Sequence, residues 1–200
     1  MELLVVISIM LILTSIFILQ QNRFNSSTLL RSLAYSVALS VRQAQVYGTS
    51  IRENVVGAFD STTNPAAKAY GIYLSSGSTG SYILFADANN DGQYTSGENV
   101  QVFTLNSGYT ISKFCATTGG GTQRCFIAGG SSAITNLTIL FKRPNPDSCF
   151  ATSVSTNACQ TGAVPTETYS SGYIQVKSGS DTRSVNMTLT GQITVGAQGS

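Results

Sequence analysis

The sequence predicts an α+β fold in which a long N-terminal hydrophobic helix packs its second half on an antiparallel β-sheet domain. Two observations predict this class. An apolar run comes first and continues into a stretch with apolar residues at spacings of three and four, as in an amphipathic helix. After Gly48 the apolar period shifts to two, in short segments separated by Gly, Asn, Asp and Ser. Helix first and strands after is the order of an α+β domain.

The helix is predicted in two halves. Residues 1–22 are the transmembrane or filament-core half, because the apolar run from Leu3 to Leu19 covers about 25 Å of helix, close to the thickness of a bilayer core. Residues 23–200 are the globular domain, which begins with an amphipathic helix over 23–48. Its apolar positions are Leu30, Leu33, Val37, Val41 and Ala44. We expect one continuous helix; the alternative is a separate second helix capped by Asn25-Ser26-Ser27.

Eight short strands rich in β-branched and aromatic residues are predicted after the helix. They are Ala69–Leu74, Tyr82–Ala86, Val100–Leu105, Tyr109–Phe114, Leu137–Lys142, Tyr173–Lys177, Ser184–Leu189 and Gln192–Val195. Two of the segments between them have the composition of a hairpin turn: Asn106-Ser107-Gly108 and Thr190-Gly191. Both are therefore predicted to join neighbouring strands of the sheet.

Composition argues against several classes of function. Only 10% of the residues are charged, with 11 basic against 9 acidic groups, which argues against a general polyanion binder. Histidine is absent, so the chain lacks the base of a Ser-His-Asp triad or Cys-His dyad and the commonest metal ligand. We therefore expect a protein that is not an enzyme.

The four cysteines form two pairs, Cys115 with Cys125 and Cys149 with Cys159, and each pair encloses nine residues. Zinc sites favour two to four residues between paired cysteines, so this spacing argues against a metal. Outside the cytoplasm, two disulfides are the expected state. Three connectivities are open, and we favour the local one because each pair brackets a loop rich in Gly, Ser, Thr and Asn. The alternative is four free buried thiols.

An acidic loop from residue 87 to residue 98 fits the calcium-loop pattern D-x-[DN]-x-[DN]-G-x5-E at every fixed position. Calcium takes six to eight oxygen ligands, and Gly92 would permit the sharp turn. The ligands would come from Asp87, Asn89, Asp91, Gln93 and Glu98. The flanking segments are predicted strands rather than helices, and the same residue types form turns without metal. A structural calcium ion and a metal-free turn both stay open.

The N-terminal residues carry a resemblance to a known family. Glu2 followed by Leu3-Leu4-Val5-Val6-Ile7 at the head of an apolar helix resembles the N-terminal signature of type IV pilins and pseudopilins. Met1 aligns with the variable residue of that motif and Glu2 with its acid. The cleavage-site glycine, the Phe-Thr-Leu and the basic leader are missing from this sequence. We therefore expect residues upstream of Met1.

Later segments extend the resemblance to the H-type pseudopilin and FimT-like minor pilin group. The sequence Val41-Arg42-Gln43-Ala44-Gln45, the segment 82–87, the acidic loop and a terminal hairpin at Gly191 occur in this order. Residues 115–170 look like an elaboration. The resemblance implies a structural subunit of a type IV pilus or a type II secretion-like pseudopilus. Such a subunit is a single-pass cytoplasmic-membrane protein before assembly and part of an extracellular or periplasmic filament afterwards.

The implied partners are copies of the chain and other pilins, the inner-membrane assembly platform and the prepilin peptidase. By resemblance, Glu2 would neutralise the free amino terminus of a neighbouring subunit, since a carboxylate in an apolar bundle needs a cation or a proton. The alternative is a helix-end carboxylate favoured only by the helix dipole. The alternative function is a low-copy minor pilin at a filament tip that binds DNA or a surface ligand. The absence of basic residues after Arg183 argues against DNA.

Overall fold

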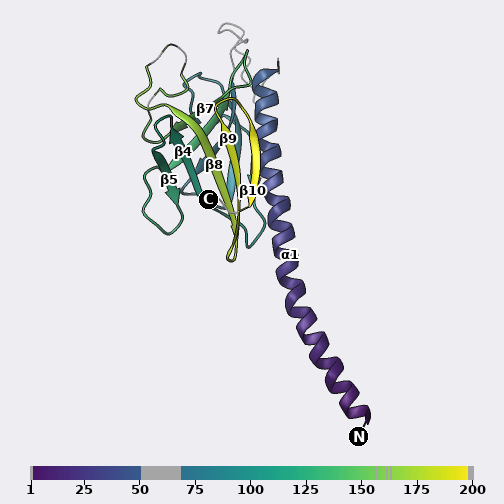
Figure 1. Ribbon diagram of the computed structural model, residues 1–200. Helices are drawn as coiled ribbons and strands as arrows, with labels where there is room; N and C mark the ends of the chain where they lie inside the picture. Colours follow the sequence, from purple (N-terminus) through teal and green to yellow (C-terminus); the bar gives the residue numbers. More distant parts are fainter. Residues whose placement is uncertain (1, 51–68, 156, 161, 163, 198–200) are drawn as a thin grey trace.

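The computed structural model describes residues 2–50, 69–155, 157–160, 162 and 164–197, with the side chains of 18–26 and 197 left aside. One helix, α1 (Glu2–Thr49), precedes ten strands (Figure 1). The strands are β1 (Ala69–Ser75), β2 (Ser81–Asp87), β3 (Asn99–Thr104), β4 (Thr110–Thr118), β5 (Gln123–Ile127), β6 (Asn136–Phe141), β7 (Ser148–Thr152), β8 (Tyr169–Ser178), β9 (Asp181–Thr188) and β10 (Ile193–Ala197).

The strands form two separate five-stranded antiparallel sheets. Sheet A has the order β3-β2-β1-β6-β7, and sheet B has the order β10-β9-β8-β4-β5. Apolar side chains from the inner faces of both sheets and from the second half of α1 meet in one hydrophobic core. Ile72 and Leu84 enter it from sheet A, and Phe114 and Ile174 enter it from sheet B; all four are fully buried.

The predicted fold class is wrong, because it placed one sheet against a long hydrophobic helix where the structure has two sheets. The difference arises at Asn106-Ser107-Gly108, which was predicted to be a hairpin. These residues do turn, with Gly108 at φ 89° and the amide of Tyr109 donating to Asn106 O at 3.1 Å. However, β3 before the turn belongs to sheet A and β4 after it belongs to sheet B. The turn carries the chain from one sheet to the other.

A second correction concerns the helix and the location. Among the residues that the structure describes, no helix combines the length and the apolar character that a membrane crossing requires. The apolar run of α1 is followed directly by the polar residues Gln20, Gln21, Asn22 and Arg23. The predicted long hydrophobic helix, the transmembrane assignment of residues 1–22 and the single-pass membrane localisation are therefore wrong.

The second half of α1 packs on the β domain through one face. This face is made of side chains spaced three and four apart, each no more than 1% exposed: Leu30, Ala34, Val37, Val41 and Ala44. Polar contacts fix the same face, since the side-chain amide of Gln45 donates to Pro146 O at 2.8 Å and to Gly191 O at 3.1 Å. The helix is thereby attached to β1 and β6 of sheet A and to β8, β9 and β10 of sheet B.

Residues 115–170, which look like an elaboration in the sequence, belong to the framework. β5 and β7, neither of which was predicted, are the edge strands of sheet B and sheet A. β6 lies beside β1 in the middle of sheet A, with Ile72 opposite Ile139. The segment therefore supplies strands to both sheets and cannot be removed without opening the core.

Candidate functional site

The first part of α1 carries an uncovered apolar surface. We call residues 3–17 the apolar segment; it projects away from the β domain (Figure 1). Its large apolar side chains are 47–71% exposed, on every side of the helix. Of its three hydroxyl side chains, Ser8, Thr14 and Ser15, two bond back to the preceding turn: Ser8 to Val5 O at 2.8 Å and Thr14 to Met10 O at 2.7 Å. These two hydroxyls are thus satisfied within the helix, and the outer surface is mainly apolar.

Glu2 is the first residue of α1 and is exposed. An acidic residue in the first turn of a helix is favoured by the helix dipole. No described residue forms a hydrogen bond or ion pair with its carboxylate. The structure therefore places Glu2 at the tip of the apolar segment, far along the helix from the β domain, and does not bring it together with the other predicted site residues.

The acidic loop joins β2 to β3, and its first residue is buried. Asp87 is 1% exposed, and its carboxylate accepts hydrogen bonds from the amides of Asp91 at 3.2 Å and Gly92 at 3.0 Å. Burial raises the pKa of Asp87 from its usual 3.8 to about 6, although the amide of Gly92 acts in the opposite direction. The neighbouring carboxylates of Glu98 and Asp91 raise it further.

The remaining predicted ligands bond to the backbone of the same loop. The Asn89 side-chain oxygen accepts from the amide of Asp91 at 3.0 Å, and the Asp91 carboxylate accepts from the amide of Gln93 at 2.8 Å. Glu98 is 7% exposed; one of its oxygens accepts from the amide of Ala88 at 2.9 Å and the other from that of Thr95 at 2.7 Å. The side chains of Asp87, Asn89, Asp91 and Glu98 thus stabilise the loop by accepting hydrogen bonds from its own backbone amides.

This arrangement does not fit a calcium ion. A calcium site needs several oxygens that converge on one point. Among the described residues, no three His, Cys, Asp or Glu side chains are grouped in a way that could hold a metal. The carboxylate oxygens of the loop instead point to backbone amides. Calcium binding by this loop stays a prediction that would require the side chains to rearrange.

Both disulfides form, with the local pairing that was favoured from the sequence. Cys115 and Cys125 occupy directly opposed positions of β4 and β5, with their Cα atoms 4.1 Å apart. Cys149 of β7 is bonded to Cys159 in the following loop, with a Cα separation of 5.7 Å. Two disulfides are typical of an oxidising compartment.

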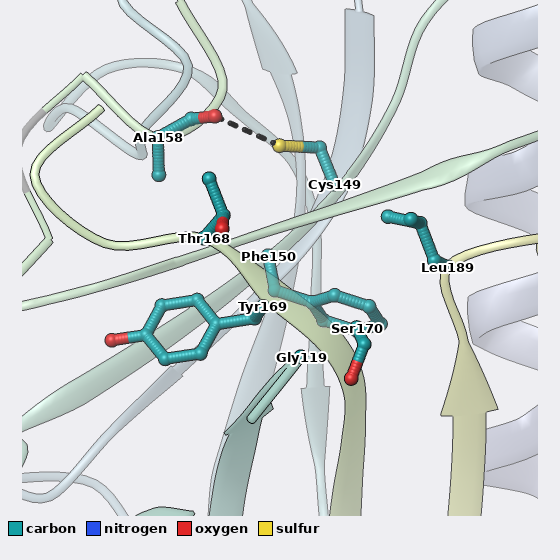
Figure 2. A pocket seen from close by; sticks show the side chains of 8 residues that line it. All are labelled: Gly119, Cys149, Phe150, Ala158, Thr168, Tyr169, Ser170 and Leu189. Carbon is teal, nitrogen blue, oxygen red and sulfur yellow. Dashed lines mark hydrogen bonds between the residues drawn. The ribbon is translucent and has the colours of Figure 1, made fainter. Parts of the chain in front are cut away.

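A small hollow of about 340 Å³ lies between β7, the start of β8 and the turn after β9. Figure 2 shows the rings of Phe150 and Tyr169 and the side chain of Leu189 around it. The dashed line in Figure 2 joins Cys149 Sγ to Ala158 O at 3.2 Å; since this sulfur is in a disulfide, it has no proton to donate, and the pair is a close contact. The lining is mainly apolar.

The polar groups beside this hollow are occupied within the protein. The Tyr169 hydroxyl donates to Glu167 at 2.7 Å and shares a hydrogen bond with Thr152 at 2.9 Å. Burial raises the pKa of Tyr169, while the guanidinium of Arg124, 3.1 Å away, holds the pKa of Glu167 below its usual value. Because these groups already bond to each other, we assign the hollow no ligand.

Comparison with known proteins adds no family to this description. The chain matches no protein-family model, no curated protein and no solved structure. The function is therefore inferred from the residues of the chain itself.

Proposed function

We propose that this chain is the structural subunit of a helical filament of the type IV pilin and pseudopilin kind, and that it assembles through the apolar segment of α1. The observation that carries the proposal is the uncovered apolar surface of residues 3–17. Contiguous exposed apolar surface of this size marks an interaction site. The resemblance of Glu2 and the residues after it to the pilin signature supports the same conclusion.

The distribution of the apolar side chains favours a multi-subunit assembly over a dimer. A helix that is apolar on all sides is normally buried on all sides. A single partner helix would cover one stripe and leave the rest in water. Burying a Leu, Ile or Phe side chain stabilises by roughly 1.5–3 kcal/mol, so each further neighbour adds to the stability of the assembly. Packing several copies of the segment around each other satisfies this requirement.

Glu2 would set the register of that packing. A carboxylate that enters an apolar bundle is costly unless a cation pairs with it. By resemblance to the pilin signature, that cation would be the amino terminus of a neighbouring copy. Glu2 lies at the tip of the segment, where such a pairing would fix the axial offset between subunits.

Isolation of filaments from the native cells, with mass spectrometry of their subunits, tests the proposal. We expect filaments that contain this chain. Leu11→Asp, in the apolar segment, should remove the chain from filaments, because Leu11 is 65% exposed in the single chain and would be buried in the proposed assembly. Val164→Asp is the matched control: Val164 is 86% exposed on the β domain, and the change should leave assembly intact. Filaments that lack the chain, or unchanged assembly of Leu11→Asp, would show that the proposal is wrong.

A further inference from the structure

The outer face of sheet B presents partly exposed side chains along β8. We call this surface the open face. It contains a shallow hollow of about 470 Å³, lined by residues of β4, β5, β8 and β9. This volume lies in the range of small-ligand sites. None of the site residues predicted from the sequence lines this hollow, although the Cys115–Cys125 disulfide lies beside it.

The strand register places one aromatic ring in the middle of the open face. Tyr173 of β8 lies opposite Cys115 of β4 on one side and opposite Asn186 of β9 on the other. The Cys115–Cys125 disulfide continues the same row to the edge strand β5. Ser171 and Gln175 each lie two residues from Tyr173 along β8, so they flank its ring on the same face. A half-exposed ring is thus framed by a covalent cross-link and uncharged polar side chains.

The polar groups around the ring are available to a ligand. Within the described part of the chain, the Asn186 amide and the hydroxyls of Tyr173 and Ser171 have no hydrogen-bond partner. Gln175 uses only its side-chain oxygen, which accepts from Ser112 at 3.1 Å. Side-chain amides and hydroxyls each provide both donors and acceptors. A ligand that itself carries many hydroxyls matches this mixed set better than one that only donates or only accepts.

The charge of the residues that line the hollow distinguishes between a nucleic acid and a neutral ligand. Lys113 is the one charged side chain among the described residues that line the hollow, and its Nζ lies 5.4 Å from the centre of the Tyr173 ring. Proteins that bind single-stranded nucleic acid combine aromatic rings with a basic groove that follows the phosphates. One cation is not such a groove. A neutral ligand needs no further charges, and the C–H face of a sugar ring packs on an aromatic ring that keeps its hydroxyl in water.

We propose that the open face is a carbohydrate-binding site, which takes a short stretch of a neutral glycan chain. Tyr173 provides the surface on which a sugar ring packs. Because the Lys113 ammonium lies over one face of the Tyr173 ring, the sugar packs on the face that Lys113 does not cover. Asn186, Gln175 and Ser171 bind the sugar hydroxyls. The disulfide holds β4 and β5 together beneath the site.

Ligand binding to the open face can be measured by NMR of methionine methyl groups, because the described residues contain only two methionines. Met187 of β9 follows Asn186 beside the hollow, and its side chain is 1% exposed in the core beneath the open face; Met10 lies in the apolar segment as an internal reference. The purified full chain, labelled with 13C at methionine methyls, is titrated by NMR with maltohexaose, cellohexaose and chitohexaose, and separately with oligothymidylate. At least one oligosaccharide should shift the Met187 resonance saturably and leave that of Met10 in place.

Variants test whether the ring carries the binding. Tyr173→Ala should weaken binding of that oligosaccharide by about tenfold or more, whereas Tyr173→Phe should keep most of it. Tyr35→Ala is the matched control, since Tyr35 is 47% exposed on α1 outside the site. A cooperative urea-unfolding transition of each variant without ligand shows that it is folded.

Three results would overturn the proposal: no shift of Met187 with any of the oligosaccharides, a shift with oligothymidylate alone, or binding by Tyr173→Ala as tight as that of the unchanged chain. The second result would mark the open face as a nucleic-acid site. The measurement uses isolated chain and does not depend on filaments, so its failure is separate from failure of the proposed assembly.

Discussion

The outer faces of the two sheets differ, although the sheets share one core. On sheet A, the outward side chains of Phe85 and Leu140 are 0% and 1% exposed. They lie in a second apolar cluster under Tyr73, Tyr94 and the Cys149–Cys159 disulfide. On sheet B, the outward side chains along β8 alternate with buried ones and remain partly exposed.

The difference between the two outer faces indicates the structural role of the acidic loop. Strands β1, β2 and β6 are buried on both faces, so sheet A needs a cover on its outer side. The acidic loop and the loop closed by the second disulfide provide this cover. Sheet B has a polar outer face that needs none and is left available for a ligand. The carboxylates of the acidic loop thus hold a structural cover in shape.

The largest expected effect comes from the contact between the two covering loops. Gly92 has a φ of 78°, and a Cβ there would lie 2.6 Å from the carbonyl carbon of Cys159. Gly92→Ala should lower the free energy of unfolding by about 3–4 kcal/mol, because strain at positive φ adds to the steric conflict with backbone. Urea unfolding measures it.

Gly97→Ala is the control for this change. Gly97 lies in the same loop with a φ of 103°, but a Cβ there would have no atom within 4 Å. Its cost should be limited to the backbone strain, about 1–2 kcal/mol. Equal costs at the two glycines would show that the contact with Cys159 does not hold the cover in place.

A smaller effect is expected from a pair of tyrosines, one on each outer face. The Tyr94 ring lies 4.5 Å from that of Tyr73 and 5.6 Å from that of Phe85, measured between ring centres. Tyr94→Ala should cost about 2–3 kcal/mol, since it uncovers the apolar cluster. Tyr173→Ala, on the open face, should cost less than about 1 kcal/mol. If both cost the same in urea unfolding, the face of sheet B is also structural, and the comparison between the two faces fails.

Local features of this fold could be predicted from the sequence, and pairings between distant segments could not. Eight of the ten strands are recognised from short runs of β-branched and aromatic residues between turn residues, and the cysteine loops indicate the disulfide pairing. β1 pairs with β6 and β4 with β8, over long separations that no local pattern encodes. The turn at residues 106–108 was recognised, but turn chemistry is the same whether the next strand joins the same sheet or the other one. That ambiguity produced the wrong fold class.

The site residues, too, could be predicted from the sequence only in part. The acidic loop has every residue type of a calcium loop, yet residue types do not determine whether oxygens converge on an ion or bond to nearby amides. On the open face, Lys113, Tyr173 and Asn186 come from three strands and become neighbours only through the register of sheet B. In the sequence, Tyr173 is the first residue of a predicted strand, and nothing there distinguishes an outward ring from one that packs in the core.

The cover on sheet A should also show a pH dependence, which arises from Asp87. Its pKa is raised by burial from 3.8 to about 6 in the folded chain. The folded state therefore holds this proton more tightly than the unfolded state. The stabilisation is complete below about pH 4 and is lost as the pH rises through about 6. Its size should be about 1–2 kcal/mol.

Asp87→Asn should remove this pH dependence. Between pH 4 and pH 7, the stability of the unchanged chain should fall relative to that of the variant, and the difference between the two removes the contribution of every other titrating group. Asp181→Asn, at the exposed turn between β8 and β9, is the control and should follow the unchanged chain. A constant difference for Asp87→Asn would show that Asp87 is solvated and that the cover is open at this end. A rise in stability on addition of calcium at pH 7, abolished by Asp87→Asn, would show that the loop rearranges to bind the ion. Its carboxylates would then have a second role beyond covering sheet A.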